Sequence, residues 1–68
     1  MYKTIYKTYT YEENITYVGY GVENIEQNVK IENITTDEKA LNKWVNILNK
    51  SDISNIHIYD MVNDFLVS

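Results

Sequence analysis

The sequence predicts a single α+β domain in which a three-stranded antiparallel meander is followed by two helices packed on one face of the sheet. Residues 15–34 alternate between apolar and polar side chains at period two, which is typical of half-buried strands. Residues 41–48 and 58–66 instead repeat their apolar positions at helical spacing. With 68 residues the chain has room for one domain, residues 1–68, with one layer of helix on one layer of sheet.

The second and third strands are predicted from two alternating runs separated by Glu23-Asn24. Asn tolerates the positive φ of a two-residue hairpin turn, so the turn is placed there. Val22 then opposes Ile25, and the third strand covers residues 25–33. The apolar positions of both runs fall on one face, which favours this pairing.

The first strand is predicted over residues 2–11, and its register depends on the turn that follows. A two-residue turn at Glu13-Asn14 pairs Ile5 with Val22 and directs Ile5 towards the core. Tyr2 and Tyr6 then face outward beside Tyr17. A three-residue loop would exchange the two faces, because the side-chain period of a strand is two. The pattern favours the two-residue turn.

The first helix is predicted to begin at Thr35, which has capping-box spacing to Glu38, and to end near Asn49-Lys50. The second helix follows from residue 58, with Ser54 or Asn55 as its cap. Residues 56–59 also alternate, so a short fourth strand competes with the start of that helix. The predicted core consists of Val18, Val22, Ile25, Val29, Ile31, Leu41, Trp44, Val45, Leu48, Met61, Val62 and Phe65.

Composition narrows the classes of function. The net charge is −4 and arginine is absent, which argues against direct binding of nucleic acid because phosphates require a basic surface. Cysteine is absent too, so no disulfide or thiolate metal site is available. No apolar run is long enough to span a membrane and no signal peptide opens the chain, which predicts a cytoplasmic protein.

Residues with catalytic or metal-binding potential are few. His57, Asp60 and Asp64 share one face of a possible helix, where imidazole and carboxylates suit a divalent metal. A solvated helix face explains them more simply, since no further ligand has comparable spacing. The Gly19-x-Gly21 pair lies inside a strand rather than before a helix, unlike a phosphate-binding loop. We therefore expect no enzymatic activity, no cofactor and no metal.

Residues 34–66, and above all His57-Ile58-Tyr59-Asp60-Met61-Val62-Asn63-Asp64-Phe65-Leu66, resemble the C-terminal half of a small uncharacterised family from clostridial-type bacteria. Members of that family end in a His-aliphatic-Tyr-Asp-x-Val-x-Asp-Phe-Leu pattern, from which this chain departs at Asn63, where an acid is expected. The family has no assigned activity. The resemblance implies a bacterial or phage cytosolic protein and adds no catalytic residue.

The most informative feature for function is the clustering of tyrosine, a residue well suited to contact surfaces. Six of the seven tyrosines lie in the first twenty residues: Tyr2, Tyr6, Tyr9, Tyr11, Tyr17 and Tyr20. The predicted partner-binding residues are Tyr2, Tyr6 and Tyr17 with Glu26 and Glu32 beside them. The predicted partner is a host protein with a basic, partly apolar surface, and a nucleic-acid-handling enzyme that the chain inhibits or regulates is one candidate.

Ordinary β-propensity explains the same tyrosines equally well. Two other classes of function also remain. The first is a self-associating protein, such as a homodimer, whose first strand pairs edge to edge with a second copy. The second is a single-stranded nucleic-acid binder that stacks bases on tyrosine, which the acidic charge disfavours.

Overall fold

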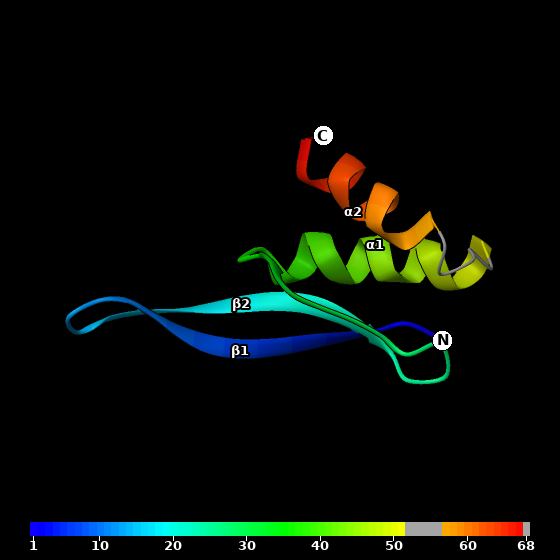
Figure 1. Cartoon of the computed structure of the whole chain (residues 1–68). Coiled ribbons are helices and arrows are strands. Elements are labelled where there is room, and N and C mark those ends of the chain that lie inside the picture. Colours follow the sequence, from blue (N-terminus) through cyan, green and yellow to red (C-terminus); the bar gives the residue numbers. More distant parts are fainter. Residues whose placement is uncertain (52–56, 68) are drawn as a thin grey trace.

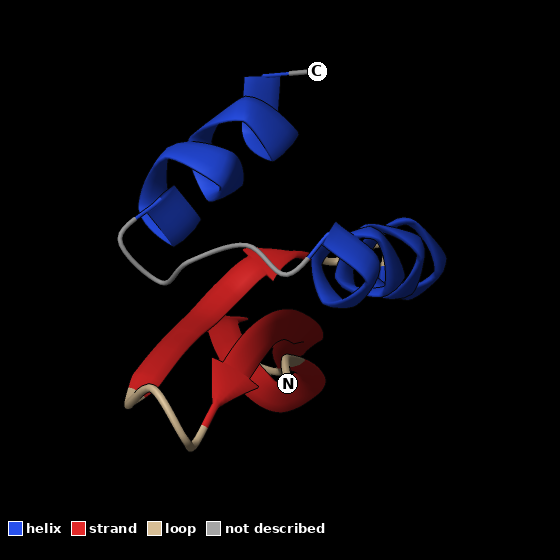
Figure 2. Cartoon of the chain, turned by 90° about the vertical axis from the view of Figure 1, so that its right-hand side faces the viewer, coloured by secondary structure: helices blue, strands red, loops and turns tan. Residues whose placement is uncertain are grey.

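The computed structural model describes residues 1–51 and 57–67, and it has the predicted architecture. Three antiparallel strands in the order β1-β2-β3 are followed by two helices. The elements are β1 (Lys3–Glu12), β2 (Ile15–Asn24), β3 (Val29–Thr35), α1 (Glu38–Ser51) and α2 (Ile58–Val67). Both helices lie on the same side of the sheet (Figure 1, Figure 2). The α+β meander predicted from the periodicities is therefore confirmed.

The β1–β2 turn lies where the sequence predicts it, but the register is shifted by one residue. Glu12 pairs with Ile15 across Glu13-Asn14, and Asn14 has the positive φ of 66° that such a turn requires. Tyr11 is then an extra residue, because the register shifts between Thr10 and Glu12. Beyond this bulge the strands continue out of the predicted register.

The shifted register exchanges the two faces of β1. Thr4, rather than Ile5, lies opposite Val22. Because successive side chains point to opposite faces, this single step turns the even-numbered side chains of β1 towards the helices. Tyr2 is consequently buried, and the Thr4 hydroxyl donates to Asn42 Oδ1 of α1 at 2.6 Å. The predicted outward face of β1 is therefore wrong.

The second hairpin turns later than predicted. β2 continues to Asn24, which pairs with Val29, and residues 25–28 form the turn. The side-chain oxygen of the buried Asn24 accepts a hydrogen bond from the backbone N–H of Gln27 at 3.3 Å. Asn28, at the end of the turn, adopts a positive φ of 56°. The Asn24 side chain thus organises a four-residue loop in place of the predicted two-residue turn. Ile25 lies in this loop, 72% exposed, so its predicted place in the core is wrong.

β3 contains an irregularity that brings Ile34 into the core. Val22 pairs with Ile31, whereas Tyr20 pairs with Thr35, so β3 has two more residues than β2 between these pairs. Asn33 has a positive φ of 55° in this segment. The resulting change of face buries Ile34, which the alternating pattern does not predict.

Both helices form as predicted, with differences at their N-terminal ends. Asp37 caps α1, because its carboxylate accepts a hydrogen bond from the Ala40 N–H at 3.1 Å. The backbone N–H of Asp37 in turn donates a hydrogen bond to the Thr35 hydroxyl at 3.1 Å. The predicted capping box between Thr35 and Glu38 is therefore wrong. Residues 58 and 59 belong to α2 and His57 directly precedes it in a helical turn, so these residues form no fourth strand. The predicted caps Ser54 and Asn55, and Ile56 of the competing strand, lie outside the described residues.

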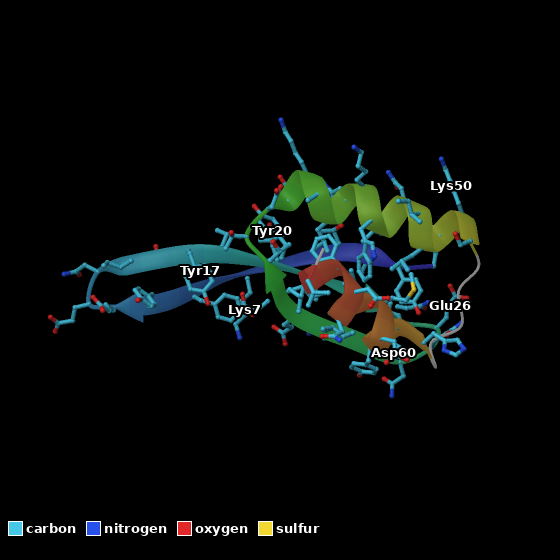
Figure 3. The ribbon with its side chains drawn as sticks, turned by 90° about the horizontal axis from the view of Figure 1, so that it is seen from above. Lys7, Tyr17, Tyr20, Glu26, Lys50 and Asp60 are labelled. Carbon is cyan, nitrogen blue, oxygen red and sulfur yellow. The ribbon has the colours of Figure 1, made fainter. Side chains whose placement is uncertain are left out.

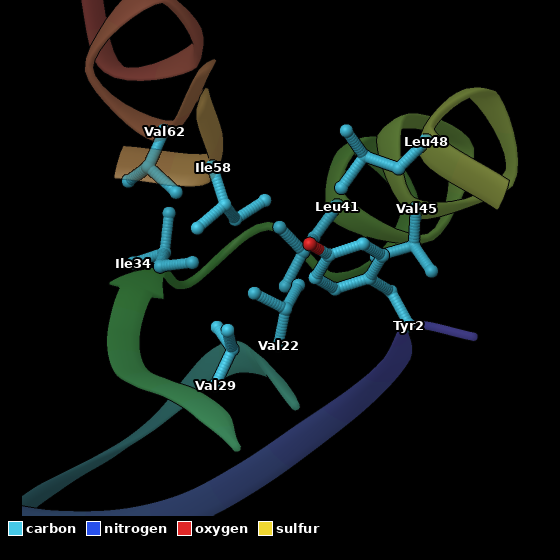
Figure 4. Close-up of a cluster of buried hydrophobic side chains, with 9 residues drawn as sticks. All are labelled: Tyr2, Val22, Val29, Ile34, Leu41, Val45, Leu48, Ile58 and Val62. Atoms are coloured by element: carbon cyan, nitrogen blue, oxygen red, sulfur yellow. The ribbon is translucent and has the colours of Figure 1, made fainter. Parts of the chain in front are cut away.

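The core lies between the sheet and the two helices (Figure 4). Trp44 and Phe65 are partly buried against it, with ring centroids 5.2 Å apart. Val18 is exposed on a part of β2 that the helices do not cover, so its predicted burial is wrong. The buried core side chains of the described residues are Tyr2, Val22, Val29, Ile34, Leu41, Val45, Leu48, Ile58 and Val62.

Candidate partner-binding surface

The β1–β2 hairpin is longer than the rest of the domain can cover. β3 pairs with β2 only from Tyr20 to Asn24, and the two helices lie over that same end of the sheet (Figure 1). Residues 7–19, which we call the arm, therefore project as a two-stranded ribbon beyond the helices. The molecule is accordingly elongated, with principal extents of 41 × 25 × 18 Å.

The structure does not place the tyrosines on one face. Tyr2 lies in the core, where only 5% of it is exposed. Tyr6 is 75% exposed on the helix side of the sheet, and its ring lies 6.3 Å from that of Tyr20. Tyr9 and Tyr17 stack on the opposite face with centroids 5.4 Å apart. The prediction that Tyr2, Tyr6 and Tyr17 share one surface is therefore wrong, because the bulge at Tyr11 moves Tyr2 and Tyr6 to the other face.

The stacked pair on the far face is built from side chains of all three strands. Asn33 Nδ2 of β3 donates to the Tyr17 hydroxyl at 3.1 Å, and Lys7 Nζ lies 5.6 Å from the centre of the Tyr9 ring. The Tyr9 ring also covers the bare backbone of Gly19, where an added Cβ would lie 2.8 Å from Tyr9 Cε2. Figure 3 shows Lys7 and Tyr17 on the ribbon beyond the helices.

The predicted acidic residues are exposed but lie apart from each other in the fold. Glu26 belongs to the β2–β3 turn, where its carboxylate forms a salt bridge with the N-terminal ammonium at 3.2 Å. Glu32 acts on the far face: burial raises the pKa of Tyr9, and the negative charge of Glu32 and the electrostatic interaction with Tyr17 raise this pKa further. Glu32 therefore lies near the stacked tyrosines, while Glu26 lies at the other end of the sheet.

The arm exposes apolar side chains that the sequence pattern does not place on a binding surface. Tyr11 is 70% exposed and Ile15 is 48% exposed, on either side of the turn, and Val18 follows on β2. The turn itself carries the exposed carboxylates of Glu12 and Glu13. The strand lengths explain this surface, because β1 and β2 have 10 residues each whereas β3 has 7. The sequence patterns, which predict a third strand over residues 25–33, do not show this difference.

The candidate metal-binding and catalytic residues do not form a site. His57 is exposed just before α2, Asp60 is exposed in its first turn, and Asp64 is exposed one turn later. Among residues 1–51 and 57–67, no three histidine or acidic side chains gather closely enough to hold a metal ion. Ser54, which could serve as a nucleophile beside His57, lies outside the described residues. No helix in the described part is long and apolar enough to cross a membrane.

Comparison with known proteins adds no relative. The chain matches no family model, and neither the curated proteins nor the solved structures include a significant match. The resemblance of residues 57–66 to the clostridial-type family therefore stays a prediction.

Proposed function

We propose that the protein is a small non-enzymatic interaction module that binds a partner protein through its arm. The observation that supports this proposal most strongly is the exposure of Tyr11, Ile15 and Val18 on a ribbon that the helices leave uncovered. Apolar side chains gathered on one projecting element are typical of binding surfaces, whereas singly scattered ones are ordinary. Tyr6, at the base of the arm, adds a rigid aromatic ring with a polar tip.

The charge at the end of the arm suggests the chemistry of the partner. Glu12 and Glu13 carry two negative charges next to Tyr11 and Ile15. A surface that is both basic and partly apolar complements this combination. Nucleic-acid-handling enzymes have such surfaces, so we propose an inhibitor or regulator of such an enzyme, in the cytoplasm of a bacterium or acting there from a phage. Direct binding of nucleic acid is disfavoured by the net charge of −4.

The test compares two double variants as baits for binding proteins from bacterial lysate. Tyr11→Ser with Ile15→Ser removes the apolar end of the arm, while Tyr59→Ser with Leu66→Ser removes equally exposed side chains from α2. We expect the arm variant to lose captured proteins that the α2 variant retains. Raising the salt concentration should weaken that capture, because the acidic turn contributes to it.

The proposal fails if the arm variant is folded by circular dichroism and still captures every protein that the wild type captures. It also fails if the α2 variant loses those proteins while the arm variant keeps them, since the binding surface would then lie on α2.

A further inference from the structure

The arm lacks a third strand. Between Lys7 and Gly19 the ribbon has two strands, because β3 joins the sheet only from Tyr20 onwards. A two-stranded ribbon is marginally stable in water, and a third strand or a covering helix normally supports it. The arm has neither over its two outer edges. The edge of β2 is open only from Ile15 to Gly19, whereas the edge of β1 is open from Thr4 onwards, so β1 has most to gain from a further strand.

The backbone groups on that outer edge can be assigned from the contacts of Tyr2. Its N–H donates to Asn49 Oδ1 at 2.8 Å and its C=O accepts from Asn49 Nδ2 at 2.9 Å, so both groups point away from β2. Every second residue of a strand points its backbone groups to the same side. Thr4, Tyr6, Thr8 and Thr10 therefore direct their N–H and C=O groups towards the open edge, which is a template for strand pairing.

We propose that β1 pairs with β1 of a second copy of this chain, antiparallel and around a twofold axis at Thr8. The two hairpins then form one four-stranded sheet in the order β2-β1-β1-β2. This inference does not rest on the proposed partner binding, since it uses the backbone edge of β1 rather than the exposed apolar side chains at the end of the arm.

Three symmetric registers pair at least three of the four outward-pointing residues with outward-pointing residues of the second copy, and the structure favours one of these registers. An axis at Tyr6 brings Thr10 of the second copy against Tyr2, whose backbone groups Asn49 already occupies. An axis at Lys7 places two ammonium groups directly opposite each other, which is unfavourable. An axis at Thr8 avoids both problems and places Lys7 opposite Tyr9 of the second copy, a pairing of the kind already present within one chain.

The charges on the two copies also complement each other in the register centred on Thr8. It brings the acidic turn of one copy, which follows the bulge at Tyr11, next to Thr4 of the other, and Thr4 is held against α1 through Asn42. The solvent-facing side of α1 carries Lys39, Lys43 and Lys50, and no acidic residue occurs from residue 39 to residue 51. Figure 3 shows Lys50 among the side chains that α1 directs away from α2. The acidic turn of each arm would therefore lie beside the basic side of the other copy's helix.

The first test measures the dimer dissociation constant by analytical ultracentrifugation. Thr8→Lys places two like charges at the twofold axis and should raise the dissociation constant roughly tenfold or more. Thr16→Lys is the matched control: it makes the same change at an exposed position of β2, on the opposite edge of the ribbon, and should leave the constant unchanged. Glu12→Lys with Glu13→Lys should weaken the dimer, and adding Lys39→Glu with Lys43→Glu should restore it.

The second test uses the absence of cysteine from the chain. Directly opposed residues of a hydrogen-bonded antiparallel pair have Cα atoms about 5.5 Å apart, within the range of a disulfide. Thr8→Cys should therefore cross-link rapidly on oxidation, whereas Thr10→Cys and Thr16→Cys should not. Because cysteine is close to threonine in size, this variant tests the register even if Thr8→Lys does not fold.

Three results would overturn the proposal. The first is a protein that remains monomeric at every concentration tested. The second is a dimer whose dissociation constant is the same for folded Thr8→Lys and Thr16→Lys. The third is preferential cross-linking of Thr10→Cys, which would place the axis elsewhere.

Discussion

The side-chain amide of Asn49 on α1 bonds to both backbone polar groups of Tyr2, with the N–H donating to Oδ1 at 2.8 Å and the C=O accepting from Nδ2 at 2.9 Å. Asn49 thus provides the two hydrogen bonds that a neighbouring strand would otherwise make to this residue. It also fixes the start of β1 against the helix, so that the Tyr2 ring enters the core. One pair of residues 47 positions apart thus joins the start of β1 to the C-terminal end of α1.

We expect Asn49→Ala to lower the free energy of unfolding by about 2 kcal/mol, because it removes two partly buried hydrogen bonds worth about 1 kcal/mol each. Asn46→Ala, on the exposed side of the same helix, should change it by less than about 0.5 kcal/mol. Urea denaturation measures both, and hydrogen exchange should show a loss of protection at the Tyr2 amide in Asn49→Ala alone. Equal stability of the two variants would contradict this role.

The Tyr2 hydroxyl is buried, and no described residue has hydrogen-bond geometry with it. The Asn24 side chain lies near it and slightly favours the phenolate, but burial has the larger effect and raises the pKa of Tyr2 above its ordinary value of 10.0. Tyr2→Phe removes a hydroxyl whose burial is uncompensated. We expect the variant to be as stable as the wild type at neutral pH, or more stable by about 1 kcal/mol.

The same substitution should alter the response to alkali. Because the pKa of Tyr2 is higher in the folded state than in the unfolded state, its contribution to stability is complete below pH 10 and is lost as the pH rises through the folded-state pKa. Tyr2→Phe should therefore lose less stability than the wild type above pH 10. Tyr9, whose pKa is also raised, titrates in both proteins, so the comparison isolates Tyr2. Parallel stability profiles would contradict the prediction.

Trp44 packs on Phe65 of α2, and this ring pair ties the second helix to the first. We expect Trp44→Ala to lower the free energy of unfolding by about 3 kcal/mol, the lower end of the range for large aromatic residues, because Trp44 is only partly buried. Ile47→Ala, an exposed position on the same helix, serves as the control. A shift of the melting temperature of a degree or two for Trp44→Ala would indicate an interface residue instead.

Gly21 and Gly19 should respond differently to the same substitution. A Cβ at Gly21 would meet the Ile31 carbonyl oxygen and lie 2.9 Å from Glu32 Cα, and both are backbone atoms. A Cβ at Gly19 would meet the side chains of Asn33 and Tyr9, which can move. We expect Gly21→Ala to cost more than about 3 kcal/mol or prevent folding, and Gly19→Ala to cost about 1–2 kcal/mol. Chemical denaturation of both variants provides the comparison, and a stable Gly21→Ala would contradict it.

The sequence by itself determined the types and order of the elements. Period-two alternation predicts β2 and β3, and the helical spacing of Leu41, Val45 and Leu48 predicts α1 with the correct face buried. These patterns report which side of each element avoids water, and this property is local to the element. The turn at Glu13-Asn14 is also local, since it depends on the tolerance of Asn14 for positive φ.

The tertiary structure alone decided which face of β1 is buried and where the tyrosines lie. One face of β1 carries Thr4, Tyr6, Thr8 and Thr10 and the other carries Lys3, Ile5, Lys7 and Tyr9. Both faces mix polar and apolar side chains, so the pattern favours one face only weakly, and here it favours the wrong one. One extra residue, the bulge at Tyr11, then reverses the faces for the rest of the strand. The reversed face brings Tyr2 to Asn49 and Thr4 to Asn42, two contacts with a helix about forty residues away that no local pattern contains. The candidate binding surface follows from the same cause, because only the paired lengths of β1, β2 and β3 show which part of the hairpin is left uncovered.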